Sequence, residues 1–183
     1  MGKRNSIYTI LIVIANLVPG IGGAQETDRW RFEADNLGIS VTISDAEYDD
    51  KRSYQVAVAN ELRTISRLDV NRDGLVTNVW LTDLDKDGDF EIVVSISQLD
   101  GSNIGAADIH EWNGFQFDST RVARLSSAQA TGYQGYDQFE IAKGYLTRSF
   151  PKFEYKDDKW TPSGKMSKFE YQFKEHRWHP TDP

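Results

Sequence analysis

Apolar and polar residues alternate with a period of two in many short segments of this chain. In 90–97 and in 168–174 every second residue is large and apolar. This alternation places one set of side chains on one face of a β-strand, packed inward. Weaker examples lie at 30–32, 39–43, 54–58, 75–82, 107–112, 115–117, 139–143 and 145–150. With almost no helical periodicity, the pattern predicts an all-β fold, an antiparallel β-sandwich or flattened barrel with long loops.

Turn residues separate these predicted strands. Asn113-Gly114 is the strongest two-residue hairpin signal in the chain, because a type I′ turn needs positive φ at both central positions. The segments 98–105 and 126–135 are rich in small and polar residues and are predicted to be loops. The chain from Glu175 onward is predicted to be a frayed tail.

The first residues resemble an export signal. Lys3 and Arg4 precede the short apolar run 7–18, and small residues before Gln25 offer a cleavage site near Ala24. The run is too short to span a bilayer comfortably, which disfavours an uncleaved membrane anchor. We therefore expect residues 1–24 to be a secretory signal peptide, and residues 25–183 to form a single periplasmic domain.

Composition narrows the class of partner. The chain has no cysteine, so an exported form depends on its core rather than on disulfides. It has 21 Lys and Arg against 28 Asp and Glu, a net charge of −7; without Lys3 and Arg4 the count is 19 against 28, or −9. Such a charge disfavours nucleic acid and anionic membranes as partners. It suits a cationic protein or a divalent metal, although simple solubility also explains it.

A turn rich in carboxylates precedes the segment 90–97 and is a candidate calcium site. Hard cations prefer oxygen ligands, and acidic side chains at alternate positions around a glycine turn can converge on one ion. The segment is not an EF-hand, because the glutamate needed at loop position 12 would fall at Val94. The alternative is a hairpin turn whose aspartates accept bonds from backbone N–H groups. The candidate ligands are Asp83, Asp85, Asp87, Asp89 and Glu91.

Nucleophilic catalysis finds little support in the sequence. There is no cysteine, and no serine lies in a Gly-x-Ser-x-Gly motif. Carboxylates are numerous enough for glycosidase chemistry, yet the sequence pairs no two of them. We expect a binding protein rather than an enzyme, with no cofactor unless calcium binds; a carbohydrate-active enzyme remains an alternative.

Two glycine-containing loops are the candidate partner-binding elements. Tyrosine beside glycine suits protein recognition, because a rigid amphipathic ring loses little entropy and glycine lets backbones approach closely. The alternative is that both loop tyrosines pack onto the sheet as core. The candidate residues are Asp100, Gly101, Ser102, Asn103, Ile104, Tyr133, Gln134, Gly135 and Tyr136.

From about Asp73 onward the chain resembles the periplasmic inhibitors of invertebrate-type lysozyme. The similarity is in the order of several motifs rather than in any one of them. These are Arg72-Asp73-Gly74, Asp83-Leu-Asp-Lys-Asp-Gly88 with Glu91, the first glycine loop, Tyr133-Gln-Gly135-Tyr-Asp137-Gln-Phe139, Arg148-Ser-Phe150-Pro151 and the Gly164 turn.

The resemblance implies a β-sandwich, often dimeric, that inserts two loops into the lysozyme cleft. The second loop of the family carries Tyr-x-Gly, which matches Tyr133-Gln134-Gly135. The first loop departs from the family's Ser-Gly-x-x-Tyr, with Asp100 in place of serine and Ile104 in place of tyrosine. A glycosidase cleft holds two carboxyl groups, and an ionised Asp100 would add charge repulsion there. We expect an inhibitor of a lysozyme, the invertebrate type favoured; the alternative is a calcium-binding module of structural or adhesive role.

Overall fold

The computed structural model describes all residues except 1–28, 45–51, 99–102, 175–176 and 182–183. The predicted signal peptide 1–24 therefore lies outside the described residues. Within them no helix is long and apolar enough to cross a membrane. The strands are β1 (Arg29–Ala34), β2 (Leu37–Ser44), β3 (Arg52–Ala59), β4 (Thr64–Arg72), β5 (Leu75–Thr82), β6 (Phe90–Ser97), β7 (Gly105–Trp112), β8 (Phe117–Arg121), β9 (Gln138–Ala142), β10 (Tyr145–Lys156), β11 (Lys159–Lys174) and β12 (Arg177–Thr181).

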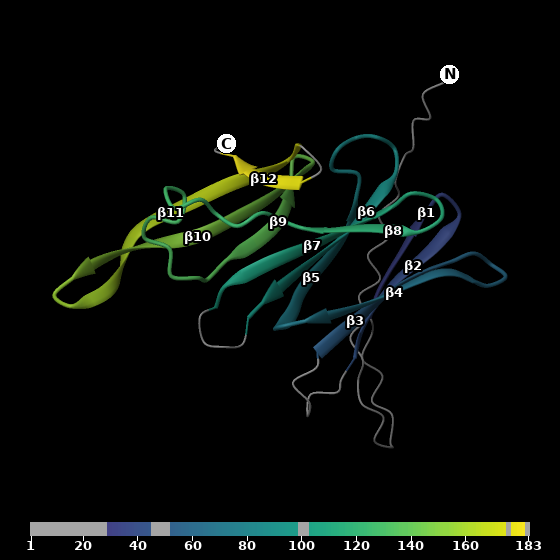
Figure 1. The fold of residues 1–183 in the computed structure, drawn as a ribbon, viewed down its shortest axis with the longest axis horizontal. Coiled ribbons are helices and arrows are strands. Elements are labelled where there is room, and N and C mark those ends of the chain that lie inside the picture. The colour runs from purple at the N-terminus through teal and green to yellow at the C-terminus, as the bar shows by residue number, and fades with distance from the viewer. Residues whose placement is uncertain (1–28, 45–51, 99–102, 175–176, 182–183) are drawn as a thin grey trace, which may run out of the picture.

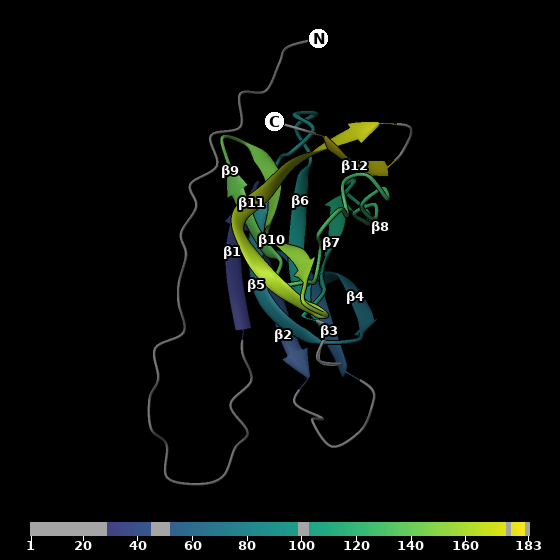
Figure 2. The same ribbon diagram turned by 90° about the vertical axis from the view of Figure 1, so that its left-hand side faces the viewer.

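These strands form three antiparallel sheets of four strands each. Their orders are β1-β2-β3-β4, β5-β6-β7-β8 and β12-β11-β10-β9. Figure 1 shows the purple and blue first sheet on one side, teal β5, β6 and β7 in the middle, and the green and yellow third sheet on the other side. Figure 2, turned by 90°, shows the curvature of β10 and β11. The predicted all-β antiparallel fold is confirmed, and the sandwich has three sheets.

The sheet β5–β8 is the central layer because it packs against both other sheets. On β6, Ile92 and Val94 belong to a core shared with the first sheet, whereas Val93 belongs to a second core shared with β10, β11 and β12. Seven of the eight residues of β6 are buried. The alternation of β6 therefore assigns its residues to two cores rather than to a core and solvent.

Strands β6 and β7 pair along their whole length, from Phe90↔Trp112 to Ser97↔Gly105. The acidic turn leads into β6 at the first of these ends, and the predicted first loop connects the strands at the second. The two candidate sites suggested by the sequence thus lie at opposite ends of one strand pair.

The predicted frayed tail is wrong in part. Residues Arg177–Thr181 form β12, which pairs with β11, and Trp178 is buried. The Trp178 ring lies 5.2 Å from the Phe173 ring and joins the second core. Burial of this large ring gives the segment enough apolar contact to hold it in the sheet.

Candidate functional site

The two predicted binding loops lie side by side. The first is closed at its base, where the Gln98 N–H donates to the Ile104 carbonyl at 2.9 Å. The second contacts it directly, because the Tyr136 N–H donates to the Asn103 carbonyl at 2.8 Å. Asp100, Gly101 and Ser102 lie outside the described residues. The flanks of the first loop and residues 133–137 of the second therefore form one continuous surface, the loop pair.

A buried carboxylate holds the loop pair together from below. The Asp137 side chain is 0% exposed. Its Oδ1 accepts from Arg148 Nε at 2.6 Å, and its Oδ2 accepts from the Gly105 N–H at 2.6 Å and from the Tyr133 hydroxyl. Three donors on three segments thus satisfy one negative charge, which links the second loop both to β7 and to β10.

Arg148 completes this anchor on β10. Its Nη2 donates to the Tyr133 hydroxyl at 2.9 Å, and its guanidinium lies over the rings of Tyr133, Phe139 and Phe150. Burial opposes the charge, yet the hydrogen bond and charge of Asp137 raise the pKa of Arg148 above its usual value. The guanidinium therefore remains charged in this apolar setting.

The two loop tyrosines have different environments. Tyr133 packs its ring edge against Phe150 at 4.7 Å, and burial followed by the bond to Asp137 raises the pKa of its hydroxyl. Tyr136 is 53% exposed and stacks on Phe153 at 6.0 Å. Ile104 is 37% exposed. Tyr133 is half-buried, whereas Tyr136 is exposed, so the alternative in which both tyrosines form core fails at Tyr136. Of the described candidate residues of the two loops, Tyr136 and Ile104 are the exposed ones.

Close packing at Gly105 fixes how the loops meet. A Cβ atom at this position would lie 2.5 Å from Asp137 Cβ and 2.9 Å from Phe139 Cε2. Only glycine therefore allows the start of β7 to reach the Asp137 carboxylate. Gly135 is buried, and Gln134 is half-buried. These two residues are therefore less accessible to a partner than Tyr136 is.

No family model, no curated protein and no solved structure matches this chain. Its fold and its candidate sites therefore rest on its own residues and their geometry. The likeness to lysozyme inhibitors stays a prediction from the sequence motifs.

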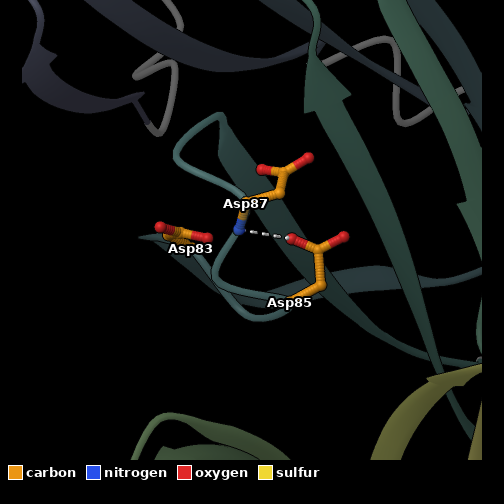
Figure 3. A group of neighbouring side chains, drawn as sticks. All are labelled: Asp83, Asp85 and Asp87. Atoms are coloured by element: carbon orange, nitrogen blue, oxygen red, sulfur yellow. Dashed lines mark hydrogen bonds between the residues drawn. The ribbon is translucent and has the colours of Figure 1, made fainter. Parts of the chain in front are cut away.

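At the opposite end of β6, the acidic turn has the hydrogen bonds expected of a hairpin turn. Asp85 Oδ1 accepts from the Asp87 N–H at 3.3 Å, and Asp87 Oδ1 accepts from the Asp89 N–H at 2.9 Å. Figure 3 shows Asp83, Asp85 and Asp87 around this turn, with the first of these bonds dashed. One oxygen from each of these three lies within 4.8 Å of the others. The turn thus fits both of the alternatives that the sequence left open.

Glu91 lies behind this turn, fully inside the protein. It is 0% exposed, and its Oε2 accepts from the Leu84 N–H at 2.8 Å. Burial raises the pKa of the Glu91 carboxyl to about 8, and the charges of Asp85, Asp83 and Glu111 act in the same direction. The predicted ligand set therefore includes one carboxyl group in an environment that disfavours its charge.

Glu111 is a member of the acidic cluster that the sequence did not single out. The register of β6 and β7 places it directly opposite Glu91, on the same face of the sheet. One oxygen from each of Asp85, Glu91 and Glu111 lies within 4.8 Å of the other two, and Asp87, Asp89 and Glu111 form a similar group. Only the strand pairing reveals this contact, since 20 residues separate the two glutamates in sequence.

A cleft of about 360 Å³ opens beside the cluster. Asp85, Asp87, Glu111 and Asp118 line it, together with the rings of Phe173 and Trp178. The acidic cluster is therefore accessible from solvent through a cleft with a carboxylate wall and an aromatic wall.

Proposed function

We propose that this chain is an exported protein that binds and inhibits a lysozyme, with the invertebrate type favoured, by inserting the loop pair into the active-site cleft. The supporting observation is the contact between the loops, made by the Tyr136 N–H and the Asn103 carbonyl at 2.8 Å. Two loops joined in this way present one continuous surface rather than two independent ones. The proposal is of a binding protein rather than an enzyme.

Rigidity of the loop pair favours tight binding. The Asp137–Arg148 pair lies at the base of both loops, with Arg148 also packed against aromatic rings. A surface held before contact loses less conformational entropy on association. Exposed Tyr136 above this base is the kind of amphipathic anchor that interfaces favour.

Charge favours a cationic partner. The net charge of −9 that remains without Lys3 and Arg4, 19 basic against 28 acidic residues, would attract a basic lysozyme and speed its encounter with this chain. Asp100 in the first loop would lie beside the two catalytic carboxyl groups of a glycosidase. Because three negative charges so close together repel one another, one member of this cluster must retain a proton. This requirement predicts stronger inhibition at mildly acidic pH than at neutral pH.

Binding titrations and lysis assays against lysozymes of the different classes test the proposal. Tyr136→Ala should weaken binding at least about tenfold, as removal of an anchoring aromatic does. Phe115→Ala is the matched control, since Phe115 is exposed on the loop between β7 and β8, at the opposite end of β7. Absence of binding to every class at micromolar concentration would reject the proposal.

Export and assembly have separate tests. The proposal places the mature chain in the periplasm, and mass spectrometry of a periplasmic fraction should find its amino terminus near Gln25. Light scattering of the purified protein distinguishes the homodimer implied by the family likeness from a monomer. An uncleaved amino terminus in the membrane fraction would contradict the proposed location.

A further inference from the structure

The carboxyl group of Glu91 lacks one of the partners that a buried carboxylate needs. Its Oε1 accepts no hydrogen bond within the described part of the chain, although the side chain is completely buried. An uncompensated carboxylate in a protein interior is strongly unfavourable. The group therefore requires either a proton or a positive charge beside it.

The largest charge effects on this carboxyl group come from acidic neighbours. The charges with the largest effects on Glu91 are those of Asp85, Asp83 and Glu111, and those with the largest effects on Glu111 belong to Asp87, Asp85, Asp89 and Asp118. None of the salt bridges formed by the described residues involves a member of this cluster. Like charges directly opposite one another on a sheet destabilise it, so the Glu91–Glu111 pair adds to the cost.

We propose that Asp85 of the acidic turn, Glu91 of β6 and Glu111 of β7 bind a calcium ion. One oxygen of each lies within 4.8 Å of the other two, close enough for a single cation to contact all three. The unpartnered Oε1 of Glu91 provides the inner ligand. The ion would supply a positive charge, which no salt bridge among the described residues provides there.

The donor set favours calcium over other divalent ions. All candidate ligands are carboxylate oxygens, which hard cations prefer, with no imidazole or thiolate to attract zinc. Asp83 and Asp87 lie close enough to Asp85 to extend the set, and calcium accepts six to eight oxygens in flexible geometry. Magnesium requires a more regular octahedron and retains more of its water.

Two features of the surroundings suit an ion site. The cleft lined by Asp85, Asp87 and Glu111 provides a route from solvent. Leu84, which donates to Glu91, and Trp178, which lines the cleft, both belong to the second core. An ion at this position would tie the acidic turn to the central sheet beside the contact with β12.

Thermal unfolding of the full mature chain with calcium and with EDTA gives the first test. Calcium about tenfold above its Kd should raise the Tm by about 4 °C, because it binds only the folded state. Magnesium at the same concentration should give a smaller rise. Absence of any shift in millimolar calcium, together with no saturable binding by calorimetry, would overturn the proposal; an equal response to magnesium would overturn the choice of calcium.

Three variants locate the site. Glu91→Gln and Glu111→Gln keep side-chain shape and remove charge, so both should abolish the calcium-dependent rise in Tm. Glu111 is only half-buried, which makes its variant the safer one to fold. Asp69→Asn removes an exposed carboxylate on β4 of the first sheet and should respond to calcium as the wild type does. An unchanged calcium response in both glutamine variants would contradict the assignment.

Terbium luminescence provides a readout that does not depend on stability. Terbium replaces calcium at oxygen sites, and an excited tryptophan nearby sensitises its luminescence. Trp178 lines the same cleft as three of the candidate ligands, Asp85, Asp87 and Glu111. In the wild type, added calcium should displace terbium and lower its luminescence. The Glu111→Gln variant should bind little terbium, so its luminescence should be weak from the start. Because the loop pair lies at the other end of β6, lysozyme binding by the Glu111→Gln variant should be unchanged.

Discussion

Each end of the β6–β7 strand pair has a buried carboxylate, and the two differ in the donors and charges that surround them. At the loop end, Asp137 has donors from Arg148, Gly105 and Tyr133. At the other end, Glu91 accepts one hydrogen bond, from the Leu84 N–H, and the charges that affect it most are those of acidic residues. Within the described residues, the first carboxylate has a partner cation and the second has none.

This difference distinguishes a structural charge from a functional one. A buried carboxylate with its own cation and two further donors fixes the position of neighbouring segments, as Asp137 does for the loop pair. A buried carboxylate surrounded by like charges reduces stability unless a proton or a ligand neutralises it. The comparison therefore predicts opposite signs for neutralising substitutions at the two ends.

Removal of the cation at the loop end should have the largest effect. Arg148→Met keeps an apolar stem between the rings but leaves Asp137 buried without a counter-charge. The free energy of unfolding should fall by about 3 to 5 kcal/mol, as for other broken buried pairs. Urea unfolding followed by tryptophan fluorescence measures it.

Arg121→Met is the control for this substitution. Arg121 also pairs with a buried aspartate, Asp108 at 2.6 Å, but its own side chain is exposed. Asp108 keeps the Tyr54 hydroxyl as a donor at 3.0 Å. The loss should be clearly smaller than for Arg148→Met; an equal loss would mean that burial of the arginine does not decide the cost.

Gly105→Ala tests whether close backbone approach at the loop end is essential. The added methyl group would lie 2.5 Å from Asp137 Cβ, which forces the two loops apart. We expect a loss of about 2 to 3 kcal/mol in the free energy of unfolding, from overpacking. Binding of the lysozyme partner should weaken as well.

Gly38→Ala is the matched control for Gly105→Ala. A Cβ at Gly38 on β2 meets no atom closer than 3.9 Å. Its stability and its binding should remain near those of the wild type. Full binding by Gly105→Ala would show that the contact between the loops is not required.

His110 shows a third way to accommodate a buried titratable group, which is to keep it neutral. Both of its ring nitrogens form hydrogen bonds: Nε2 with the Tyr54 hydroxyl at 2.6 Å and Nδ1 with Ser119 Oγ at 2.8 Å. Burial lowers its pKa to about 4, the Arg121 charge acts in the same direction, and the Asp108 charge opposes them. The folded protein therefore resists protonation at this site.

Because His110 is held neutral in the folded protein, the stability of the fold should decrease as the pH falls. The stability contributed by neutral His110 is complete above its unfolded pKa of about 6.5 and is lost as pH falls toward about 4. From about pH 7 to about pH 5 this loss should be about 2 kcal/mol. For His110→Asn, the fall in the free energy of unfolding between these two pH values should be smaller by that amount. An equal fall in the variant and the wild type would exclude His110 as the source of the pH dependence.

The period-two alternation predicted the strands but not the number of layers. In 90–97 the apolar positions led to one inward face, and Val93 on the other face was the available sign of a second core. Similarly, Trp178 in the supposed tail was a large apolar residue that required burial. A single large residue on an apparently polar face therefore indicated another sheet.

The candidate sites were predictable only where their residues are close in sequence. Asp85, Asp87 and Asp89 were found from spacing, whereas Glu111 joins them only through the register Glu91↔Glu111. Arg148 carried a usable signal, because it lies on the same face of β10 as buried Leu146 and Phe150. A charge in such a register indicates a buried partner, but the identity of that partner depends on tertiary contacts.

The smallest predicted effect is also the one most specific to the acidic end. In EDTA, Glu111→Gln removes a charge that lies opposite Glu91 and near four aspartates, so the free energy of unfolding should rise by about 0.5 to 1 kcal/mol. Glu140→Gln is the control, because Glu140 pairs with Lys168 at 3.0 Å on the third sheet and should lose a little stability or none. With calcium added, the wild type should become more stable than Glu111→Gln, since the wild type gains the ion and the Glu111 variant does not. A loss of stability for Glu111→Gln in EDTA would show that the glutamate pair is compensated within the chain, and the contrast between the two ends would then fail.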